Sequence, residues 1–515
     1  MRATTPVATT TRLRSVALVG LETADVDVEV HISAGLPSFG LVGLPDKAVA
    51  ESRERVRAAL SSLCLSLPTR RITVNLAPGD LAKEGSHYDL AIALGLLTAM
   101  NILPSDGCDG AIVMGELGLD GSIRPVPGIL AAAVEAVAQE CTLICPLASA
   151  REAAWLGDEL SIVAAADLGT LIRHLRGETI LPQPPPPDLA ADDADFRDLR
   201  DIRGQESAKR ALEIAAAGGH NLLMCGPPGS GKSMLAARIA GLLPPLSAAE
   251  MLEVGLIASV GGKLDEQGLR RTPPFRDPHH ATSAAAMVGG GSHARPGEIS
   301  LAHNGVLFLD ELPEFSRQVL EALRQPLENG TVTVARARYH VTYPARVLFV
   351  AAMNPCRCGY LDDPSRACSR APQCARDYQK RISGPLLDRI DLHVDVPAVK
   401  PQDLTLPVPG ESSADVAARV AAARNIQQDR FAALGRDDLR CNAGMGPDLI
   451  ERLCPVQPSA QSVLERATDR LGLSARGYHR VIKVARTLAD LDGRETIARV
   501  HIAEALGLRR RLPGR

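Results

Sequence analysis

Aromatic residues are scarce in this sequence, at 3% of its 515 residues. A protein that holds nucleic acid on broad stacking surfaces needs many Trp, Tyr and Phe side chains, so any such contact here is expected to rest on Arg and Lys. An excess of basic charge is also absent, because the formal net charge is −3. This balance excludes a protein that is basic overall, although it permits a local basic lining.

Long apolar runs are missing as well. The sequence has no window of about 18 uninterrupted apolar residues, which argues against a membrane-spanning helix. The apolar run from Val16 to Val19 is too short for a signal peptide. The eleven cysteines lack the density of a disulfide-rich secreted scaffold, which favours reduced thiols or a metal site in a cytoplasmic protein.

Chain length and proline runs predict several domains. At roughly 150 residues per domain, three or four are expected. The proline run in residues 181–188, followed by acidic residues 192–195, predicts a stiff linker. We expect the following units: a flexible tail over 1–11, an α/β domain over 12–180, a linker over 181–195, a second α/β domain over 196–396, a linker over 397–411 and a helical region over 412–515.

Both of the larger units show α/β patterning. In the first, strands are expected over 26–32, 72–76 and 111–115, and helices over 48–60, 88–100 and 129–138. In the second, a helix is expected over 206–217 and strands over 221–225, 306–309 and 347–352. These three strands all end in polar residues, which is typical of the active edge of a parallel sheet.

A complete phosphate-binding motif follows the strand over 221–225. Glycines in such a loop let backbone N–H groups turn towards phosphates, Lys232 adds a positive charge for the β- and γ-phosphate oxygens, and Ser233 offers a magnesium ligand. The position between a strand and a helix is the context that this motif requires. The loop consists of Gly226, Pro227, Pro228, Gly229, Ser230, Gly231, Lys232 and Ser233.

The ends of the next two strands supply the groups for hydrolysis. Asp310 is expected to hold magnesium, directly or through water, and Glu311 to polarise the attacking water. The alternative is an acidic strand cap without catalytic use. Asn354 ends the third strand and is predicted to orient that water as the residue called sensor 1.

Two arginines are candidates for stabilising the charge that spreads over a transferring phosphoryl group. Arg389 is the predicted arginine finger, supplied by a neighbouring subunit, with an ion pair to Asp388 or Asp391 as the alternative and Arg381 in reserve. Arg476 lies in the helical region and is predicted to reach the γ-phosphate within its own subunit as sensor 2. For Arg476 the alternative is a solvated helix arginine.

Two longer segments carry a family resemblance. Residues 279–291 (HHATSAAAMVGGG) and 295–305 (RPGEISLAHNG) resemble the ComM/YifB family of magnesium-chelatase-like AAA+ ATPases, and the resemblance covers nearly the whole chain. It implies an AAA+ core with a P-loop and a helical lid, preceded by a Lon-protease-like α/β domain. It further implies a ring hexamer that uses ATP and Mg²⁺ to move DNA junctions, promoting branch migration of recombination intermediates, as in natural transformation.

The resemblance also suggests where DNA would be contacted. Residues 255–300 resemble the helix-2 insert of this clade, and residues 330–343 alternate like a β-hairpin that in related helicases points into the ring pore. Basic residues in the two segments are candidates for phosphate contacts that do not depend on base sequence, with a solvated charged face as the alternative. These candidates are Arg336, Arg338, Lys263, Arg270 and Arg271.

The N-terminal unit departs from an active Lon protease. The segment from Lys83 resembles the region around the Lon nucleophile, but the serine position falls on His87. The later segment, residues 115–128, is followed by Ile-Leu-Ala-Ala at the place where Lon carries its catalytic lysine. Covalent proteolysis needs a nucleophile and a base, and both are missing from the expected positions. Ser86 and Lys83 could in principle take these two roles, but we do not expect them to do so. We expect a platform for assembly or for guiding DNA.

Four cysteines follow Asn354 closely in the sequence. Their C-x-C-x9-C-x5-C spacing is suitable for a tetrahedral zinc site, which would hold a segment that lacks a core of its own. The C-x-C start is tighter than the usual C-x2-C, and four reduced surface cysteines are the alternative. The candidate zinc ligands are Cys356, Cys358, Cys368 and Cys374.

Three functions remain open on the sequence alone. The first is an ATP-driven DNA motor, and the second is a magnesium-chelatase-type motor subunit that acts on a protein partner without DNA. The third is a regulator that binds ATP without hydrolysing it. The third is disfavoured by the presence of Lys232, Glu311 and a finger arginine, and the second by the fused N-terminal unit.

Overall fold

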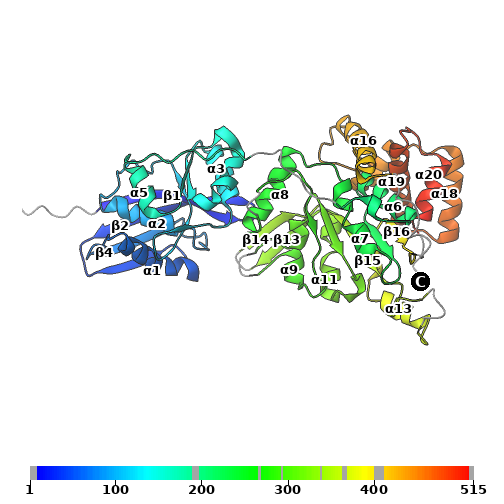
Figure 1. Ribbon diagram of the computed structural model, residues 1–515, viewed down its shortest axis with the longest axis horizontal. Coiled ribbons are helices and arrows are strands. Elements are labelled where there is room, and N and C mark those ends of the chain that lie inside the picture. Colours follow the sequence, from blue (N-terminus) through cyan, green and yellow to red (C-terminus); the bar gives the residue numbers. More distant parts are fainter. Residues whose placement is uncertain are drawn as a thin grey trace, which may run out of the picture.

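The computed structural model describes residues 9–187, 197–264, 268–291, 294–336, 339–361, 368–399 and 411–509. Three parts of the molecule follow one another along its longest axis (Figure 1): an N-terminal α/β domain, a central α/β core and a C-terminal helical lid. Among the residues described, no helix has the length and apolar character needed to span a membrane.

The N-terminal domain is built on a seven-stranded mixed sheet with the order β3-β4-β2-β1-β5-β8-β9. Its strands are β1 (Thr9–Val19), β2 (Glu22–Ser33), β3 (Ser38–Val42), β4 (Arg71–Ala77), β5 (Ile112–Val113), β8 (Leu143–Pro146) and β9 (Ile162–Ala165), with β6 (Glu116–Leu117) and β7 (Ile123–Arg124) as a separate small hairpin. Its helices are α1 (Lys47–Ser62), α2 (Asp89–Ala99), α3 (Ile129–Ala138), α4 (Ala150–Ala153) and α5 (Leu168–Leu175). The predicted strands over 26–32 and 72–76 and the three predicted helices are confirmed.

The prediction of a flexible tail over residues 1–11 is wrong for its last part. Strand β1 begins at Thr9, pairs antiparallel with β2 along its whole length and also contacts β5, so it lies inside the sheet. Leu13 and Ala17 are buried on one face, where they pack against α2 and β2. The polar first half of this strand concealed it, because residues 9–12 are all Thr or Arg and apolar residues gather only over 16–19.

The core contains a five-stranded parallel sheet with the order β11-β12-β15-β10-β16. Its strands are β10 (Leu222–Cys225), β11 (Phe275–Arg276), β12 (Val306–Leu309), β15 (Leu348–Met353) and β16 (Leu392–Asp395). Every residue of β10, β12 and β15 is buried, as expected of parallel strands that are covered on both faces. The three strands predicted for this unit are therefore confirmed, whereas β11 and β16 were not predicted.

Two edges of this sheet are important below. The carboxyl edge is the one at which the strands end, and Gly226, Asp277, Asp310 and Asn354 follow their strands there. The amino edge is the one at which the strands begin, and Asn221, Gly305 and Asp391 precede their strands there. The two edges are separated by the length of the strands. Strand β10 has four residues, so at about 3.3 Å per residue the edges lie roughly 13 Å apart.

Short helices surround the sheet of the core. They are α6 (Glu206–Gly218), α7 (Lys232–Ala236), α8 (Ala248–Val260), α9 (Ala284–Val288), α10 (Glu298–Leu301), α11 (Arg317–Ala322), α12 (Pro326–Asn329), α13 (Gln373–Gln379) and α14 (Gly384–Leu387). The predicted hairpin is confirmed as β13 (Thr331–Arg336) and β14 (Tyr339–Pro344). Residues 255–300 were expected to form an insert outside the sheet, but residues 275–276 within them form β11, which pairs with β12 and belongs to the sheet.

The lid consists of the helices α16 (Ser413–Ala432), α17 (Pro447–Leu453), α18 (Pro458–Leu471), α19 (Ala475–Leu491) and α20 (Arg499–Gly507). It is joined to the core through the last turn of α6. Arg424 donates to the carbonyl oxygen of Ala216 at 3.0 and 2.7 Å, and Gln427 donates to that of Ala217 at 3.1 Å. These side chains satisfy helix-end carbonyls that have no partner within α6.

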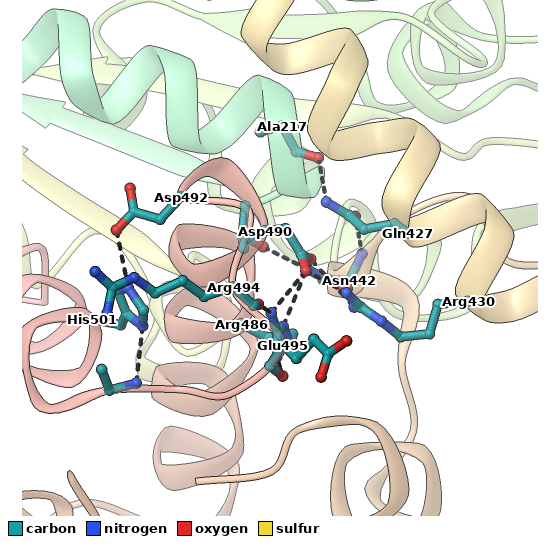
Figure 2. Close-up of polar contacts among 12 residues, drawn as sticks. Ala217, Gln427, Arg430, Asn442, Arg486, Asp490, Asp492, Arg494, Glu495 and His501 are labelled. Atoms are coloured by element: carbon teal, nitrogen blue, oxygen red, sulfur yellow. Dashed lines mark hydrogen bonds and ion pairs between the residues drawn. The ribbon is translucent and has the colours of Figure 1, made fainter. Parts of the chain in front are cut away.

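A buried polar network holds the lid helices together (Figure 2). Arg486 is only 1% exposed, bonds Asp490 and donates to the carbonyl groups of residues 494 and 495. Asp490 also accepts hydrogen bonds from Arg430 and from Asn442, the latter at 2.8 Å. Because the buried charges are paired and hydrogen-bonded, the lid avoids the cost of isolated charges in its interior.

The N-terminal domain docks on α8 of the core. The Gly128 N–H donates to the carbonyl oxygen of Ser259 at 3.1 Å, and the Ser259 hydroxyl donates to Glu152. A small apolar cluster lies at the same interface and joins Leu130 of the N-terminal domain to three buried residues of the core, Leu246, Met251 and Leu269. At the turn between β1 and β2, Gly20 lies so close to the hairpin that an added Cβ would be 2.4 Å from a methyl carbon of Val341.

Candidate functional site

The phosphate loop runs between β10 and α7 at the carboxyl edge. Gly229 and Gly231 have φ angles of +74° and +90°, which side-chain-bearing residues rarely adopt. An added Cβ at Gly226 would lie 2.0 Å from the carbonyl oxygen of Val396. Glycine is therefore required at all three positions, and the loop has the tight backbone that can bring N–H groups against a phosphate.

Lys232 and Asn354 meet beneath this loop. The Lys232 ammonium donates to the carbonyl oxygens of Gly226 at 2.8 Å and Pro227 at 2.9 Å, and to the Asn354 side-chain oxygen at 3.2 Å. Burial lowers the pKa of Lys232 from its usual value. The structure thus brings the predicted phosphate lysine and the predicted sensor-1 asparagine into direct contact.

The acidic pair after β12 lies beside the start of α7. The Ser233 hydroxyl donates to Asp310 at 2.6 Å, so the two predicted magnesium ligands already share a hydrogen bond. The other Asp310 oxygen accepts the Glu311 N–H at 2.9 Å. Glu311 has a φ of +52°, and this left-handed backbone directs the chain away from the strand line while the Glu311 side chain stays exposed.

Sequence reasoning missed Asp277 at this edge. It follows β11 directly, and β11 pairs with β12, the strand that Asp310 follows. Desolvation and the nearby charge of Asp310 raise the pKa of Asp277. The only signal in the sequence was an acidic residue after Phe275–Arg276, and a strand of two residues is too short to be recognised from periodicity.

The two predicted arginines lie together at the amino edge, not at the phosphate loop. Arg389 on the approach to β16 and Arg476 at the start of α19 both pair with Glu328 of α12, Arg476 at 3.7 Å. The Arg389 hydrogen bond and charge lower the pKa of Glu328. The expected alternative partners of Arg389 were Asp388 and Asp391, and Asp391 pairs with Arg480 at 3.3 Å.

This arrangement corrects one prediction. Arg476 was expected to reach the γ-phosphate within its own subunit, but it lies at the edge of the sheet opposite Lys232, beside Glu328. A cavity of about 930 Å³ opens at the same edge, and Arg389, Arg476 and Arg480 are among its lining residues. The reason for the error is that the lid packs against the amino edge and α6, so α19 does not cover the phosphate loop.

The cysteines after Asn354 are brought together in the structure. The Cys356 and Cys358 sulfurs are 3.1 Å apart, and the Cys368 and Cys374 sulfurs are 3.3 Å apart. The sulfurs of Cys356, Cys358 and Cys374 all lie within 4.8 Å of one another. The pKa of Cys358 is lowered to about 6, mainly by a hydrogen bond from the Tyr360 backbone and next by a hydrogen bond with the Cys356 side chain. The zinc assignment itself stays a prediction.

The basic residues proposed for DNA do not form one described patch. Lys263 follows the end of α8 near the N-terminal domain, whereas Arg271 lines the cavity at the amino edge. Lys263, Arg270 and Arg271 are exposed. Arg336 ends β13 at the tip of the hairpin, where its side chain is not described, and Arg338 lies outside the described residues. Their role stays a prediction.

The residues considered for proteolysis have other partners. Ser86 donates to Glu116, and Lys83 donates to the carbonyl oxygen of Pro78. His87 is buried, bonds the carbonyl oxygen of Val16 at 2.9 Å, and has its pKa lowered to about 4 by burial. Ser86 is therefore bonded to a carboxylate and Lys83 to a backbone carbonyl, and the likeness of this domain to Lon proteases stays a prediction.

Comparison with known families agrees with this geometry. Residues 198–404 match the model for magnesium chelatase, subunit ChlI. Residues 28–149 match a model for subunit ChlI of Mg-chelatase, and residues 410–509 match that for its C-terminal part. Over 494 residues the chain is 45% identical to the protein YifB of Escherichia coli, with 96% of each chain covered.

A second relative carries a more informative name. The competence protein ComM of Haemophilus influenzae is 44% identical over 501 residues, again with 96% of each chain covered. The chain belongs to the ComM/YifB family of magnesium-chelatase-like proteins. Membership of this family supports an AAA+-type core with ATPase activity that uses ATP and Mg²⁺.

A more distant similarity is confined to part of the chain. The DNA replication licensing factor Mcm2 of Drosophila melanogaster is 27% identical over 209 residues, which is 37% of this chain and 20% of that protein.

Proposed function

We propose that this ComM/YifB-family chain is a cytoplasmic ATPase that assembles into a hexameric ring and moves DNA, promoting branch migration of recombination intermediates, as in natural transformation. The observation that carries the proposal is the division of the hydrolysis groups between two opposite edges of one sheet. Lys232, Ser233 and Asp310 lie at the carboxyl edge, whereas Arg389 and Arg476 lie at the amino edge.

Residues at the carboxyl edge fit a nucleotide with its magnesium ion. Gly226 leaves no room for a side chain, Gly229 and Gly231 have positive φ angles, and Ser233 and Asp310 place two hard oxygen ligands together. Bound ATP supplies the γ-phosphoryl group, whose transfer to water drives the motor. Glu311 accepts the proton of that water, and Asn354, held by Lys232, orients it.

Residues at the amino edge complete the site of a neighbouring subunit. In a ring, the amino edge of one subunit faces the carboxyl edge of the next, so Arg389 and Arg476 act across the interface. A planar guanidinium supplied in this way neutralises charge that develops on the phosphoryl oxygens. The Nε of Arg389 and the Nη1 of Arg480 are buried and have no hydrogen-bond partner among the described residues, so these side chains would have to turn outwards to reach such an acceptor.

The DNA part of the proposal rests on the hairpin and on the names of the relatives. The hairpin β13–β14 carries Arg336 at its tip and is followed directly by the approach to β15, the strand that Asn354 follows. One strand therefore connects the hairpin to the nucleotide site. The relative named a competence protein and the one named a DNA replication licensing factor support a role on DNA.

A magnesium-chelatase-type motor that acts on a protein partner is the second candidate. The observation that favours it is the match of all three family models to subunit ChlI. In this alternative the same edges hydrolyse ATP, but DNA has no effect on turnover.

A DNA-response experiment separates the two candidates. ATP hydrolysis by the full chain is measured with and without a branched DNA, together with migration of the branch point. Arg336→Ala with Arg338→Ala is expected to flatten the salt dependence of binding by about one to two log–log units, since each phosphate contact contributes roughly 0.9. Basal hydrolysis should persist, while stimulation and branch migration fall together.

A matched control is Arg53→Ala with Arg57→Ala, two exposed arginines of α1. It should leave the salt slope and the branch migration unchanged. A wild-type protein whose hydrolysis ignores DNA would favour the chelatase-type motor. An unchanged slope with intact migration in the hairpin variant would move the DNA contact to Arg270 and Arg271.

A further inference from the structure

The cysteine cluster has the geometry of a metal site. In a tetrahedral site with Zn–S distances of about 2.3 Å, the sulfurs are about 3.8 Å apart. The two close sulfur pairs, at 3.1 and 3.3 Å, are somewhat shorter than that spacing. The three sulfurs that lie within 4.8 Å of one another allow distances somewhat longer than it. Cys368 is outside this triplet, but its sulfur is in contact with that of Cys374 and can supply the fourth ligand if its side chain turns towards the other two.

The segment that carries the cluster has few other means of keeping its shape. Between the end of β15 at Met353 and the start of α13 at Gln373, the described residues form only turns and irregular backbone. Its apolar contribution to the core is small, with Cys356 the one fully buried member of the cluster. A metal cross-link is the usual way of ordering such a loop.

Two residues in the first part of the segment touch the nucleotide site. Asn354, which contacts the Lys232 ammonium at 3.2 Å, is two residues before Cys356. Gly359, one residue after Cys358, packs on the phosphate loop so closely that an added Cβ would lie 2.4 Å from a ring carbon of Pro228. The buried Gln379 of α13 donates to the carbonyl oxygen of Pro355 at 2.9 Å and holds the segment from the other side.

We propose that Cys356, Cys358, Cys368 and Cys374 bind one Zn²⁺ and that this ion positions Asn354 and the phosphate loop for hydrolysis. The four cysteines are positioning residues, because they act through Asn354 and Gly359 without touching the nucleotide. The inference rests on the ATPase activity within the proposed function and is independent of DNA. Loss of the ion should therefore lower the rate of hydrolysis more than the affinity for nucleotide.

The first test measures metal and turnover together. Full-length protein purified without added metal should contain about one zinc per chain. Cys368→Ser should lose that zinc, and its kcat without DNA should fall by about tenfold or more, the scale found when groups that support a metal centre are removed. Binding of a fluorescent ATP analogue should change by less than about threefold, on the scale of a weak contact. Chelation of the wild type should reproduce this split, and added Zn²⁺ should reverse it.

Two further variants keep the test decisive if Cys368→Ser folds poorly. Cys64→Ser, at an exposed cysteine of the N-terminal domain, is the matched control and should keep both zinc and turnover. Gly359→Ala should keep its zinc but lose turnover, because the added methyl group meets Pro228 and the residue has a φ of +84°.

The results that overturn the proposal are equally distinct. Zinc-free wild-type protein with full ATPase activity, or a mass that shows disulfides among the four cysteines, would exclude the metal site. Bound zinc whose removal leaves kcat unchanged would reduce the ion to a local support. All of these readouts are taken without DNA, so a failure of the DNA-motor proposal would leave them intact.

Discussion

At the carboxyl edge of the core sheet, the groups for phosphate and magnesium follow directly from the ends of three strands. At the amino edge, the arginines come from the approach to β16 and from a lid helix that begins at Ala475. At the first edge each group directly follows the end of a strand in one parallel sheet, whereas at the second edge the groups come from a loop and from a helix outside the sheet. Under the proposed function, one chain therefore contains both halves of a hydrolysis site but does not bring them together.

The largest expected effect tests whether the two edges meet between subunits. Arg389→Ala should lower kcat by roughly 10³–10⁵-fold, as is found for arginine fingers. Mixed with Glu311→Gln subunits, it should regain activity, because some interfaces then combine an intact Glu311 with an intact Arg389. The measurement is ATP hydrolysis across a series of mixing ratios. A mixture as inactive as either variant alone would show that the two edges do not form a shared site.

The next effect concerns the carboxyl edge alone. Glu311→Gln should lower kcat by roughly 10²–10⁴-fold, because activation of water belongs to the transition state. Nucleotide binding and assembly should persist, whereas Lys232→Ala should lose nucleotide affinity as well. Steady-state hydrolysis and equilibrium binding measure the two quantities. Glu321→Gln on α11 is the control and should behave as wild type, while near-normal turnover of Glu311→Gln would refute the site.

The smallest effect concerns Glu328, which holds both arginines at the amino edge. Its pair with Arg389 is partly exposed, so Glu328→Gln should change the free energy of unfolding by only about 0–1 kcal/mol. Because Arg389 lowers the pKa of Glu328, this contribution is present above the ordinary carboxyl pKa and is lost as the pH falls through the lowered value. Thermal unfolding curves of the two proteins should therefore converge in acid. A loss of several kcal/mol at neutral pH would mean that Glu328 is a core structural residue.

The carboxyl edge was largely predictable from the sequence because its functional residues lie in short contiguous motifs. A strand, a glycine-rich loop and a helix identify Lys232, and an apolar run ending in two acids identifies Asp310. Asp277 escaped because β11 has only two residues, and its neighbour in the sheet is set by long-range packing. Strand β1 escaped because its first four residues are all Thr or Arg, so its sequence looks polar where the strand begins.

The amino edge was predictable in its residues but not in its geometry. Arg389 and Arg476 were identified from their local motifs, yet nothing in those motifs says which side of the sheet the lid covers. That choice depends on contacts such as those between α16 and α6, which join residues more than 200 positions apart. The cysteine spacing likewise predicted a metal site, but the packing of Gly359 on Pro228 is visible only in three dimensions.

The contacts between the lid and α6 also set an order of events during synthesis. The N-terminal domain has all the strands of its sheet once β9 has emerged from the ribosome, and it can fold while the rest is being made. The core must wait, because β10 lies between β15 and β16, and the carbonyls at the end of α6 find Arg424 and Gln427 only 208 and 210 residues later. Until then, the nascent core exposes unpaired strands beside a finished domain, and this interval is when it most needs a chaperone.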